Sequence, residues 1–426
     1  MNILDGTPYA GYLYAYPHKS AYRPLVPRPA LRDVWRDEPT DALFLYVHVP
    51  FCEMRCGFCN LFTRARPPAA QVSAYLAQLR SQAARVTDAL GDGARYARAA
   101  FGGGTPTYLT AAELEELFGI AGVAGVPLSV ETSPATATPD RLAVLAAHGT
   151  TRVSMGVQSF LDVEARAAGR PQRRTEVEAA LSAVRAHDFP ILNVDLIYGI
   201  DGQTPDTWAE SLDAALKWRP EELYLYPLYV RPLTGLGRRA HTPADWDTQR
   251  LTLYWQAVET LTDAGYEQRS MRQFRLAGVP DAEDEYSCQD DGMVGLGCGA
   301  RSYTRALHYS FDYAVSVREV RGVLDDYLNR RPEEFAFAEY GFALDAGEQR
   351  RRWLLKSLLR AEGVDADAYR RRFREDPPAL PELVERGWAT GDGTRLTPQG
   401  LAHSDAIGPW LVSDAVRHAM AENAPR

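Results

Sequence analysis

The sequence predicts an α/β protein built on a partial (β/α)6 TIM-like barrel, with an N-terminal strap and a C-terminal winged-helix-like α+β module. Short apolar runs alternate with amphipathic helical patterns, and glycines and polar residues follow the apolar runs. Repeated β–α units of this kind favour a parallel sheet with right-handed crossovers. We expect the strap at 1–40, the barrel at 41–275, flanking loops and helices at 276–336 and the C-terminal module at 337–426.

The composition is that of an ordinary globular protein. The 426 residues are 46% hydrophobic and carry a net charge of −9, which gives no general attraction to nucleic acid or anionic membranes. No uncharged apolar run is long enough for a transmembrane helix, and the first residues lack the pattern of a signal peptide. Three of the five cysteines are clustered, so we expect a reducing, cytoplasmic location rather than a disulfide framework.

The strap is rich in tyrosine and proline, and the prolines argue against a long helix. Aromatic residues in irregular chain either pack over a core or line a ligand cavity. A packing role is favoured for the strap. The alternative is a lid near a substrate, for which the candidates are Tyr14, Tyr16, His18 and Tyr22.

The barrel segment holds six strand candidates separated by helical patterns. The strands are Leu43–His48, Arg98–Phe101, Leu128–Glu131, Arg152–Val157, Ile191–Ile197 and Leu223–Leu228. The helical patterns cover about 72–90, 139–149, 176–186 and a segment that begins near Thr204-Pro205. In barrels of this kind the chemistry lies at the C-terminal ends of the strands.

Three cysteines follow the first strand with the spacing C-x3-C-x2-C: Cys52, Cys56 and Cys59. Three thiolates on one loop can hold three irons of a 4Fe–4S cluster and leave the fourth iron open. Zinc usually takes four nitrogen or sulfur ligands, and a thioredoxin-like site needs only two cysteines. The spacing therefore favours the cluster.

Polar residues and glycines also follow the other strands. They are Gly102–Thr105, Glu131, Gln158, Asp195, Tyr224 and Tyr226. Each alone is explained as a turn glycine, a capped carboxylate or a core tyrosine. Their common position at one rim of the barrel, beside the cysteines, indicates a binding site.

The cysteine spacing with Phe58 before the last cysteine, together with Phe101-Gly-Gly-Gly-Thr-Pro-Thr107 and Ser154-Met-Gly-Val-Gln-Ser-Phe160, resembles the HemN-like radical S-adenosylmethionine (SAM) enzymes. This group is named for oxygen-independent coproporphyrinogen III oxidase. The resemblance runs from about Tyr14 to Asp195 and weakly onward. It implies that SAM binds the open iron and is cleaved to a 5′-deoxyadenosyl radical, with an electron donor such as flavodoxin or ferredoxin.

The resemblance also implies roles for individual residues at this rim. Tyr46 and Phe58 would contact SAM, with Phe58 against the adenine. Gly103, Gly104 and Thr105 would bind its aminocarboxylate end, since only glycine lets backbone amides approach a ligand so closely.

Other rim residues would bind SAM through charge. Glu131 would accept from an ammonium or ribose hydroxyl, and Tyr46 and Glu131 are also catalytic candidates. The positions expected around a second SAM are Gln158, Arg170 and Asp195. Arg170 could pair with a carboxylate through its fork, or be a solvated surface arginine. Arg301 would reach SAM or the substrate by a looser analogy.

One departure bears on the reaction. Coproporphyrinogen oxidases have a further cysteine two positions past the third cluster cysteine, where this sequence has Leu61. Leu61 beside retained second-SAM positions resembles class C radical SAM methyltransferases and cyclopropanases, so we expect methylation or cyclopropanation of a small molecule. The alternatives are coproporphyrinogen III decarboxylation and a heme-binding or heme-trafficking protein.

Beyond the barrel, we expect a helix at 246–265 and a seventh strand over Glu267–Phe274. Cys288 and Cys298 are interpreted as reduced cysteines of a buried loop, with Cys288 as the alternative, a catalytic thiol. Three helices (348–362, 365–374, 380–387) and a hairpin at 388–397 predict the winged-helix-like module. Its arginines suggest DNA binding, but a cover over the substrate cavity is preferred.

Overall fold

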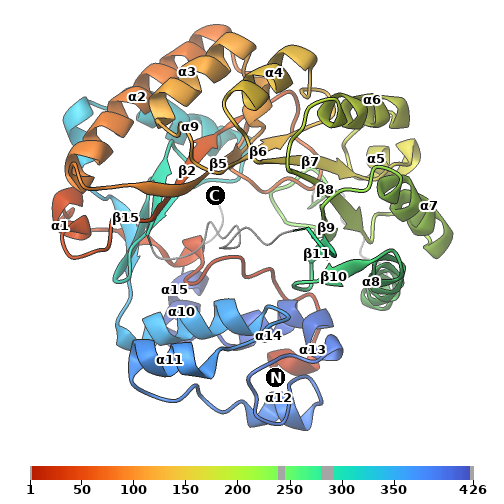
Figure 1. Cartoon of the computed structure of the whole chain (residues 1–426). Coiled ribbons are helices and arrows are strands. Elements are labelled where there is room, and N and C mark those ends of the chain that lie inside the picture. Colours follow the sequence, from red (N-terminus) through yellow and green to blue (C-terminus); the bar gives the residue numbers. More distant parts are fainter. Residues whose placement is uncertain (1, 238–244, 280–291, 423–426) are drawn as a thin grey trace.

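The computed structural model describes residues 2–237, 245–279 and 292–422. Its described strands form one 13-stranded sheet and a separate two-stranded pair. Helices cover the outer face of the large sheet, and a second group of helices lies below it in the view of Figure 1.

Six strands at the centre of the sheet run parallel to one another: β2 (Leu43–Val49), β5 (Tyr96–Gly103), β6 (Leu128–Thr132), β7 (Arg152–Gln158), β8 (Ile191–Tyr198) and β9 (Glu222–Pro227). The main helices between them are α2 (Ala69–Leu90), α3 (Ala111–Ala121), α4 (Pro139–Ala147), α6 (Arg174–Arg185) and α7 (Pro205–Leu216). This order confirms the partial (β/α)6 barrel. In the described part of the chain the sheet is open, because the strands at its two edges, β1 and β10, do not pair with each other.

Local sequence explains where these helices begin and which face they bury. In α3, Thr110 and Glu113 form a reciprocal capping box, and α4 starts at Pro139, where the missing N–H is not needed. Helix α2 buries Val72, Leu76 and Leu79 against the sheet. That spacing is the apolar stripe of an amphipathic helix.

The sheet continues on both sides of the parallel core. Strand β12 (Met293–Leu296) pairs parallel with β2, and beyond it follow β13 (Arg301–Tyr303), β14 (Leu307–Ser310), β15 (Tyr340–Ala343) and β1 (Arg23–Pro24), all antiparallel. At the other edge lie β11 (Gln273–Leu276) and β10 (Tyr266–Gln268).

The prediction of a single strand over Glu267–Phe274 is wrong. The segment splits into β10 and β11, which pair antiparallel. The turn between them is closed by the amide of Arg269 donating to the carbonyl of Gln273 (2.8 Å), while the hydroxyl of Ser270 accepts from the Gln273 amide (3.1 Å). A serine turn within a short, mostly polar segment carries no Gly or Pro signal and is easily missed.

The remaining helices are α1 (Leu31–Trp35), α5 (Asp162–Ala167), α8 (Trp246–Asp263), α9 (Val317–Leu328) and the C-terminal group α10 (Ala346–Leu358), α11 (Ala366–Phe373), α12 (Pro381–Glu385), α13 (Pro398–Ala402), α14 (Ser404–Trp410) and α15 (Asp414–Ala421). The hairpin predicted at 388–397 is reduced to one isolated bridge between Ala389 and Leu396. Two glycines at 391 and 393 leave few side chains there to pair across strands.

Two large hydrophobic clusters lie in different parts of the structure. One fills the space between the sheet and its covering helices. The other joins the C-terminal helices to Leu4, Tyr16 and Ala21 of the strap. Among the described residues, no helix has the length and apolar character needed to span a membrane.

Candidate active site

The three clustered cysteines lie where β2 ends. Cys52 belongs to the short strand β3 (Phe51–Cys52), and Cys56 and Cys59 follow on the loop that leads to β4 (Arg64–Ala65). All three thiols are free and half-buried. We call residues 52–59 the cysteine loop.

Each sulfur of the cysteine loop has a polar neighbour. The Cys52 Sγ lies 3.4 Å from the hydroxyl of Thr105, and the Cys59 Sγ lies 3.8 Å from that of Thr63. The Cys56 Sγ accepts from Nη1 of Arg170 at 3.7 Å. Hydrogen bonds to the sulfurs are one of the means by which proteins tune iron–sulfur clusters.

Without a cation, burial raises the pKa of Cys52 and Cys56, and negative neighbours including Cys59 and Glu53 raise it further. A bound cation of high charge reverses this preference and deprotonates coordinating thiols. No three His, Cys, Asp or Glu side chains in the described ranges are grouped for a single metal ion. Because a 4Fe–4S cluster assigns its thiolates to separate irons, three hydrogen-bonded thiols on one loop fit that group.

Two other segments hold the cysteine loop in place. The amide of Gly57 donates to the carbonyl of Gly169 (3.1 Å), and its carbonyl accepts from Leu236 (2.8 Å). A Cβ at Gly57 would lie only 2.7 Å from the carbonyl oxygen of Ala168, so this position requires glycine. Next to it, Phe58 packs against an apolar cluster at the ends of β8 and β9.

The glycine turn after β5 uses its amides inside the protein. The amide of Gly103 donates to the Glu131 carboxylate (3.1 Å), that of Gly104 to Val49 (2.7 Å) and that of Thr105 to Phe51 (2.8 Å). Neither glycine tolerates a side chain, since a Cβ at Gly103 would meet the His48 ring at 2.4 Å. In this structure all three amides donate within the protein, so the predicted contact of these amides with SAM stays a prediction.

Two carboxylates, Glu131 on β6 and Asp195 on β8, form an acidic pair at the rim. Burial raises the pKa of Glu131 to about 7, and the negative charge of Asp195 adds to the shift. Burial also raises the pKa of Asp195 to about 6, against the opposing effects of Asn193, Arg152 and other neighbours. Strongly shifted carboxylates in a recessed site are candidates for binding or catalysis.

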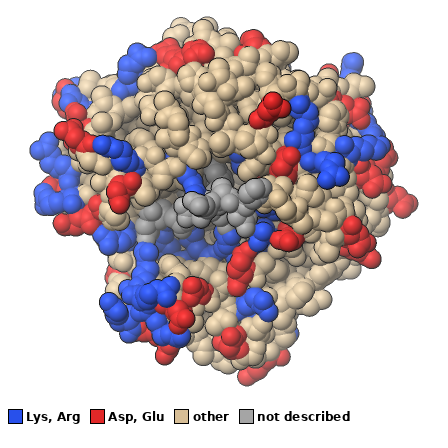
Figure 2. Space-filling view, in the orientation of Figure 1, with Lys and Arg blue, Asp and Glu red and all other residues tan. Residues whose placement is uncertain are grey.

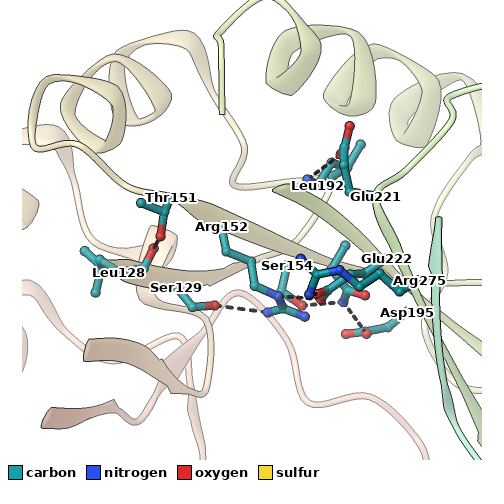
Figure 3. Close-up of polar contacts among 11 residues, drawn as sticks. Leu128, Ser129, Thr151, Arg152, Ser154, Leu192, Asp195, Glu221, Glu222 and Arg275 are labelled. Carbon is teal, nitrogen blue, oxygen red and sulfur yellow. Dashed lines mark hydrogen bonds and ion pairs between the residues drawn. The ribbon is translucent and has the colours of Figure 1, made fainter. Parts of the chain in front are cut away.

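A polar network lies next to Asp195 (Figure 3). Arg152 donates from Nε to Glu222 (2.8 Å) and from Nη1 to Ser129 (3.0 Å), and Arg275 donates to the other oxygen of Glu222 (3.2 Å). All three charged side chains are buried. We call Arg152, Glu222 and Arg275 the barrel-floor triad.

Asparagine 193 connects the floor of the barrel to the acidic pair. Its Nδ2 donates to the Ser154 hydroxyl and to Oδ1 of Asp195, both at 2.8 Å (Figure 3). Its buried Oδ1 finds no hydrogen-bond partner among the described residues. A buried acceptor of this kind next to a carboxylate is suited to a ligand N–H or O–H.

Two of the residues predicted for a second SAM flank the acidic pair. Gln158 ends β7 at a bulge and has a φ of +71°, a left-handed conformation that is rare for a side-chain-bearing residue. Arg170 is half-buried and donates to Gln172 (3.0 Å) as well as to Cys56. Arg170 is thus directed into the site and is not a solvated surface arginine.

On the opposite side of the cysteine loop, the strap meets β13. Arg301 donates from Nη1 to the hydroxyl of Tyr14 (2.7 Å). Tyr14 and Tyr46 of β2 pack against the same small cluster of Ala15, Met293 and Tyr303. Tyr46 and Arg301, both predicted as site residues, therefore lie in the same region of the structure, where the strap meets β12 and β13.

The strap candidates divide into two groups. Tyr16 bonds to Glu348 and Ser413 inside the C-terminal cluster, and Tyr22 is fully buried, so both are structural. His18 accepts from the Ser20 amide (3.3 Å) and packs edge-on against Tyr14 (5.5 Å between ring centroids). Tyr14 and His18 are the ones that remain near the rim.

A pocket of about 200 Å³ lies between the strap, the β10–β11 turn and helices α10 and α14. Its lining includes the cationic residues Arg269, Arg272, Lys356 and Arg360, together with Asp405. Figure 2 shows Lys and Arg side chains at the walls of the hollow between the sheet and the C-terminal helices. Several of these cations pair with carboxylates, as Arg272 does with Asp405 and Arg269 with Glu362.

Of the two remaining cysteines, Cys298 is fully buried and contacts Tyr75, which fits the reduced structural cysteine expected. Cys288 lies outside the described residues. Sequence reasoning missed the barrel-floor triad and Lys19, whose ammonium lies 3.2 Å from the centre of the Tyr313 ring. An arginine inside the apolar run 152–157 was the one available signal for the triad.

Comparison with known proteins agrees with this geometry. The family model for the radical SAM superfamily matches residues 46–215. The oxygen-independent coproporphyrinogen III oxidase of Salmonella typhimurium is 32% identical over 398 residues, which cover 85% of this chain and 83% of the relative. That of Paracoccus denitrificans is 28% identical over 417 residues, covering 91% and 90%. The solved structure of coproporphyrinogen III oxidase (HemN) from Escherichia coli superposes with a TM-score of 0.75 at 24% identity, covering 90% of this chain and 92% of that one.

Proposed function

This chain belongs to the HemN-like family of the radical SAM superfamily, and from that premise we propose that it uses one SAM as a radical source and a second SAM as a carbon donor. Family membership makes it a radical SAM enzyme with a 4Fe–4S cluster and SAM. When bound, the cluster supplies the electron that cleaves SAM to methionine and a 5′-deoxyadenosyl radical. Cys52, Cys56 and Cys59 would hold it.

The observation that carries the proposal is the acidic pair with Arg170 beside the cysteine loop. SAM has an ammonium and a sulfonium, which carboxylates of the protein can stabilise, and a carboxylate, which a protein cation can bind. Glu131 would accept from the ammonium of the first SAM, next to the Thr105 hydroxyl. Phe58, packed on the apolar cluster at the ends of β8 and β9, would face the adenine.

A second SAM would use the other half of the same rim. Arg170 would pair with its carboxylate through a planar fork. Asp195 and the unpaired Oδ1 of Asn193 would accept from its ammonium or ribose hydroxyls. Gln158, in its left-handed conformation, would complete the contact.

The proposed reaction is transfer of one carbon from the second SAM to an sp2 carbon of a small-molecule substrate, as methylation or cyclopropanation. Leu61, 47% exposed, stands where the resemblance places a further cysteine in coproporphyrinogen oxidases. Decarboxylation of coproporphyrinogen III is the second candidate, and the names of the relatives favour it. A heme-trafficking role, the third, requires no carbon transfer.

The test is anaerobic incubation of the reconstituted enzyme with SAM and a chemical reductant, followed by mass analysis. 5′-Deoxyadenosine together with S-adenosylhomocysteine supports carbon transfer. 5′-Deoxyadenosine alone, with loss of CO2 from added coproporphyrinogen III, supports the second candidate. Stoichiometric heme binding without either product supports the third. For turnover in the cell we propose a flavodoxin or ferredoxin as donor, in keeping with a reducing cytoplasm.

The second SAM has its own test in Asp195→Asn. The substitution should leave the absorption of the cluster unchanged and reduce bound SAM from about two to about one per chain, because an amide accepts more weakly from an ammonium. Equilibrium dialysis with labelled SAM measures this number. Wild type that binds a single SAM, or a variant with unchanged stoichiometry, contradicts the two-SAM proposal.

A further inference from the structure

Three cationic side chains from separate segments face the strap side of the cysteine loop. Lys19 comes from the strap, Arg231 from the segment after β9, and Arg301 from β13. Burial lowers the pKa of Lys19 most, the charges of Arg301 and Arg231 lower it further, and Cys59 opposes the shift. Burial also lowers the pKa of His18 most, and all three cations add to that shift. The three groups therefore lie within electrostatic range of one another. We call them the cation triad.

Aromatic rings take the place of counter-ions in the cation triad. Lys19 Nζ lies 3.2 Å from the centre of the Tyr313 ring, Arg231 lies 4.8 Å from the Tyr229 ring, and Arg301 lies 5.1 Å from the Tyr14 ring. None of the three forms an ion pair with a carboxylate in the described ranges of the chain. Burial lowers the pKa of Arg301, and the neighbouring groups that raise it most are Tyr14, Tyr303 and Tyr22.

Cations held together in this way repel one another. Removing an ammonium or guanidinium from water without a counter-charge is unfavourable, and a cation–π contact recovers only about 0.5–2 kcal/mol. A site that keeps three of them is suited to an anion that arrives from outside. The arrangement is the reverse of the acidic pair on the other side of the loop.

The cation triad lies beside the reaction centre. The hydroxyl of Tyr313, under Lys19, donates to the carbonyl of Asn60 next to Cys59 (2.8 Å). Tyr14, which accepts from Arg301, also lines the pocket between the strap and the C-terminal helices. Tyr14 is therefore shared by the pocket and the cation triad, and Tyr313 connects Lys19 to the end of the cysteine loop.

We propose that Lys19, Arg231 and Arg301 form a subsite for an oxyanion substituent, a carboxylate or phosphate, of the organic substrate. The inference rests on the proposed function, because it assigns the substrate to the strap side and SAM to the rim side with Arg170. The carboxylate of SAM is the competing source of the same chemistry, and the test separates the two.

The probe is coproporphyrin III, a fluorescent polycarboxylate, bound to the reconstituted holoenzyme without reductant. Wild type should quench its fluorescence saturably, and salt or inorganic pyrophosphate should weaken binding. Lys19→Gln, Arg231→Gln and Arg301→Gln should each weaken it about tenfold, the usual order for one hydrogen bond to a charged group. Lys19→Arg should retain it, and Arg80→Gln, at an exposed site on α2, serves as the matched control.

SAM binding by equilibrium dialysis is measured on the same samples, with cluster absorption as the check on folding. The proposal expects unchanged SAM affinity in the triad variants. Variants that lose SAM but keep porphyrin assign the triad to SAM and overturn the proposal, as does wild type without saturable, salt-sensitive porphyrin binding. 5′-Deoxyadenosine formation without porphyrin reports on the proposed function separately, so either can fail alone.

Discussion

The two sides of the cysteine loop have opposite charge chemistry. Toward β5–β8, Glu131 and Asp195 share a recessed rim with Arg170, and burial raises the pKa of both carboxyls. Toward the strap, Lys19 and Arg301 stand among tyrosine rings and have no carboxylate partner in the described ranges. The rim side suits a zwitterion that carries a sulfonium, and the strap side suits an anion.

This difference explains how one barrel mouth can keep two ligands apart. A ligand with an ammonium is repelled by the cation triad, and a polycarboxylate is repelled by the acidic pair. The contrast between the two sides thus assigns each ligand its place without a wall between them. The cysteine loop lies at the boundary.

The largest expected effect comes from removing a cysteine of the cysteine loop, which lies between the two sides. Cys56→Ala should abolish the visible absorption of the cluster and all 5′-deoxyadenosine formation, because two thiolates hold the cluster poorly. Anaerobic reconstitution followed by absorption spectroscopy and product analysis measures both. Cys298→Ala, at the buried cysteine beside Tyr75, should retain both. SAM cleavage by reconstituted Cys56→Ala would show that the ligands are assigned wrongly.

A smaller effect tests what supports the rim side. Glu222→Gln removes the carboxylate that pairs with both Arg152 and Arg275, and breaking such a buried pair typically costs about 3–5 kcal/mol of unfolding free energy. Denaturant unfolding of the two proteins compares them. Glu116→Gln, which removes the exposed partner of Arg80, should change the free energy by less than about 1 kcal/mol. An equal loss of unfolding free energy in both variants would show that the barrel-floor triad has no structural role.

The smallest effect is a pH dependence of the acidic pair. The folded protein keeps a proton on Glu131 up to about pH 7, whereas the unfolded chain releases it near 4.5. The contribution to stability is therefore fully present below about pH 4.5 and is lost as the pH rises through 7. SAM affinity should change the other way, rising between pH 6 and 8 as the carboxylate ionises.

Glu131→Gln should flatten both profiles, which unfolding and dialysis at several pH values can measure. Glu385→Gln, at an exposed position on α12, is the matched control and should keep the wild-type slopes. A SAM affinity that stays constant from pH 6 to 8 in wild type would show that Glu131 does not bind the ammonium.

The parts of the site that sequence could predict are local. The spacing of Cys52, Cys56 and Cys59 and the position of Glu131 at a strand end follow from a short stretch of chain and the rule for parallel barrels. The role of the glycine turn was harder to predict, because its amides donate to Glu131, Val49 and Phe51, and all three of these acceptors lie on other segments.

Features made by distant residues could not be predicted. Arg152 and Glu222 are 70 positions apart, and only the register of β7, β8 and β9 brings them together. Lys19 reaches Tyr313 across most of the chain. The single strand predicted at Glu267–Phe274 also failed, because a four-residue turn without glycine or proline separates β10 from β11. Pairing register and turn geometry depend on the whole fold, not on composition.

The placement of the strap has a consequence for how this chain is made. Leu4, Tyr16 and Ala21 are buried among helices that start only at residue 346, and Arg386 pairs with Asp5 (2.6 Å). During synthesis Leu4, Tyr16 and Ala21 leave the ribosome well before residues 346–416, so these strap residues must wait for the helices that bury them. The strap can therefore reach its buried position only after the C-terminal helices have been made.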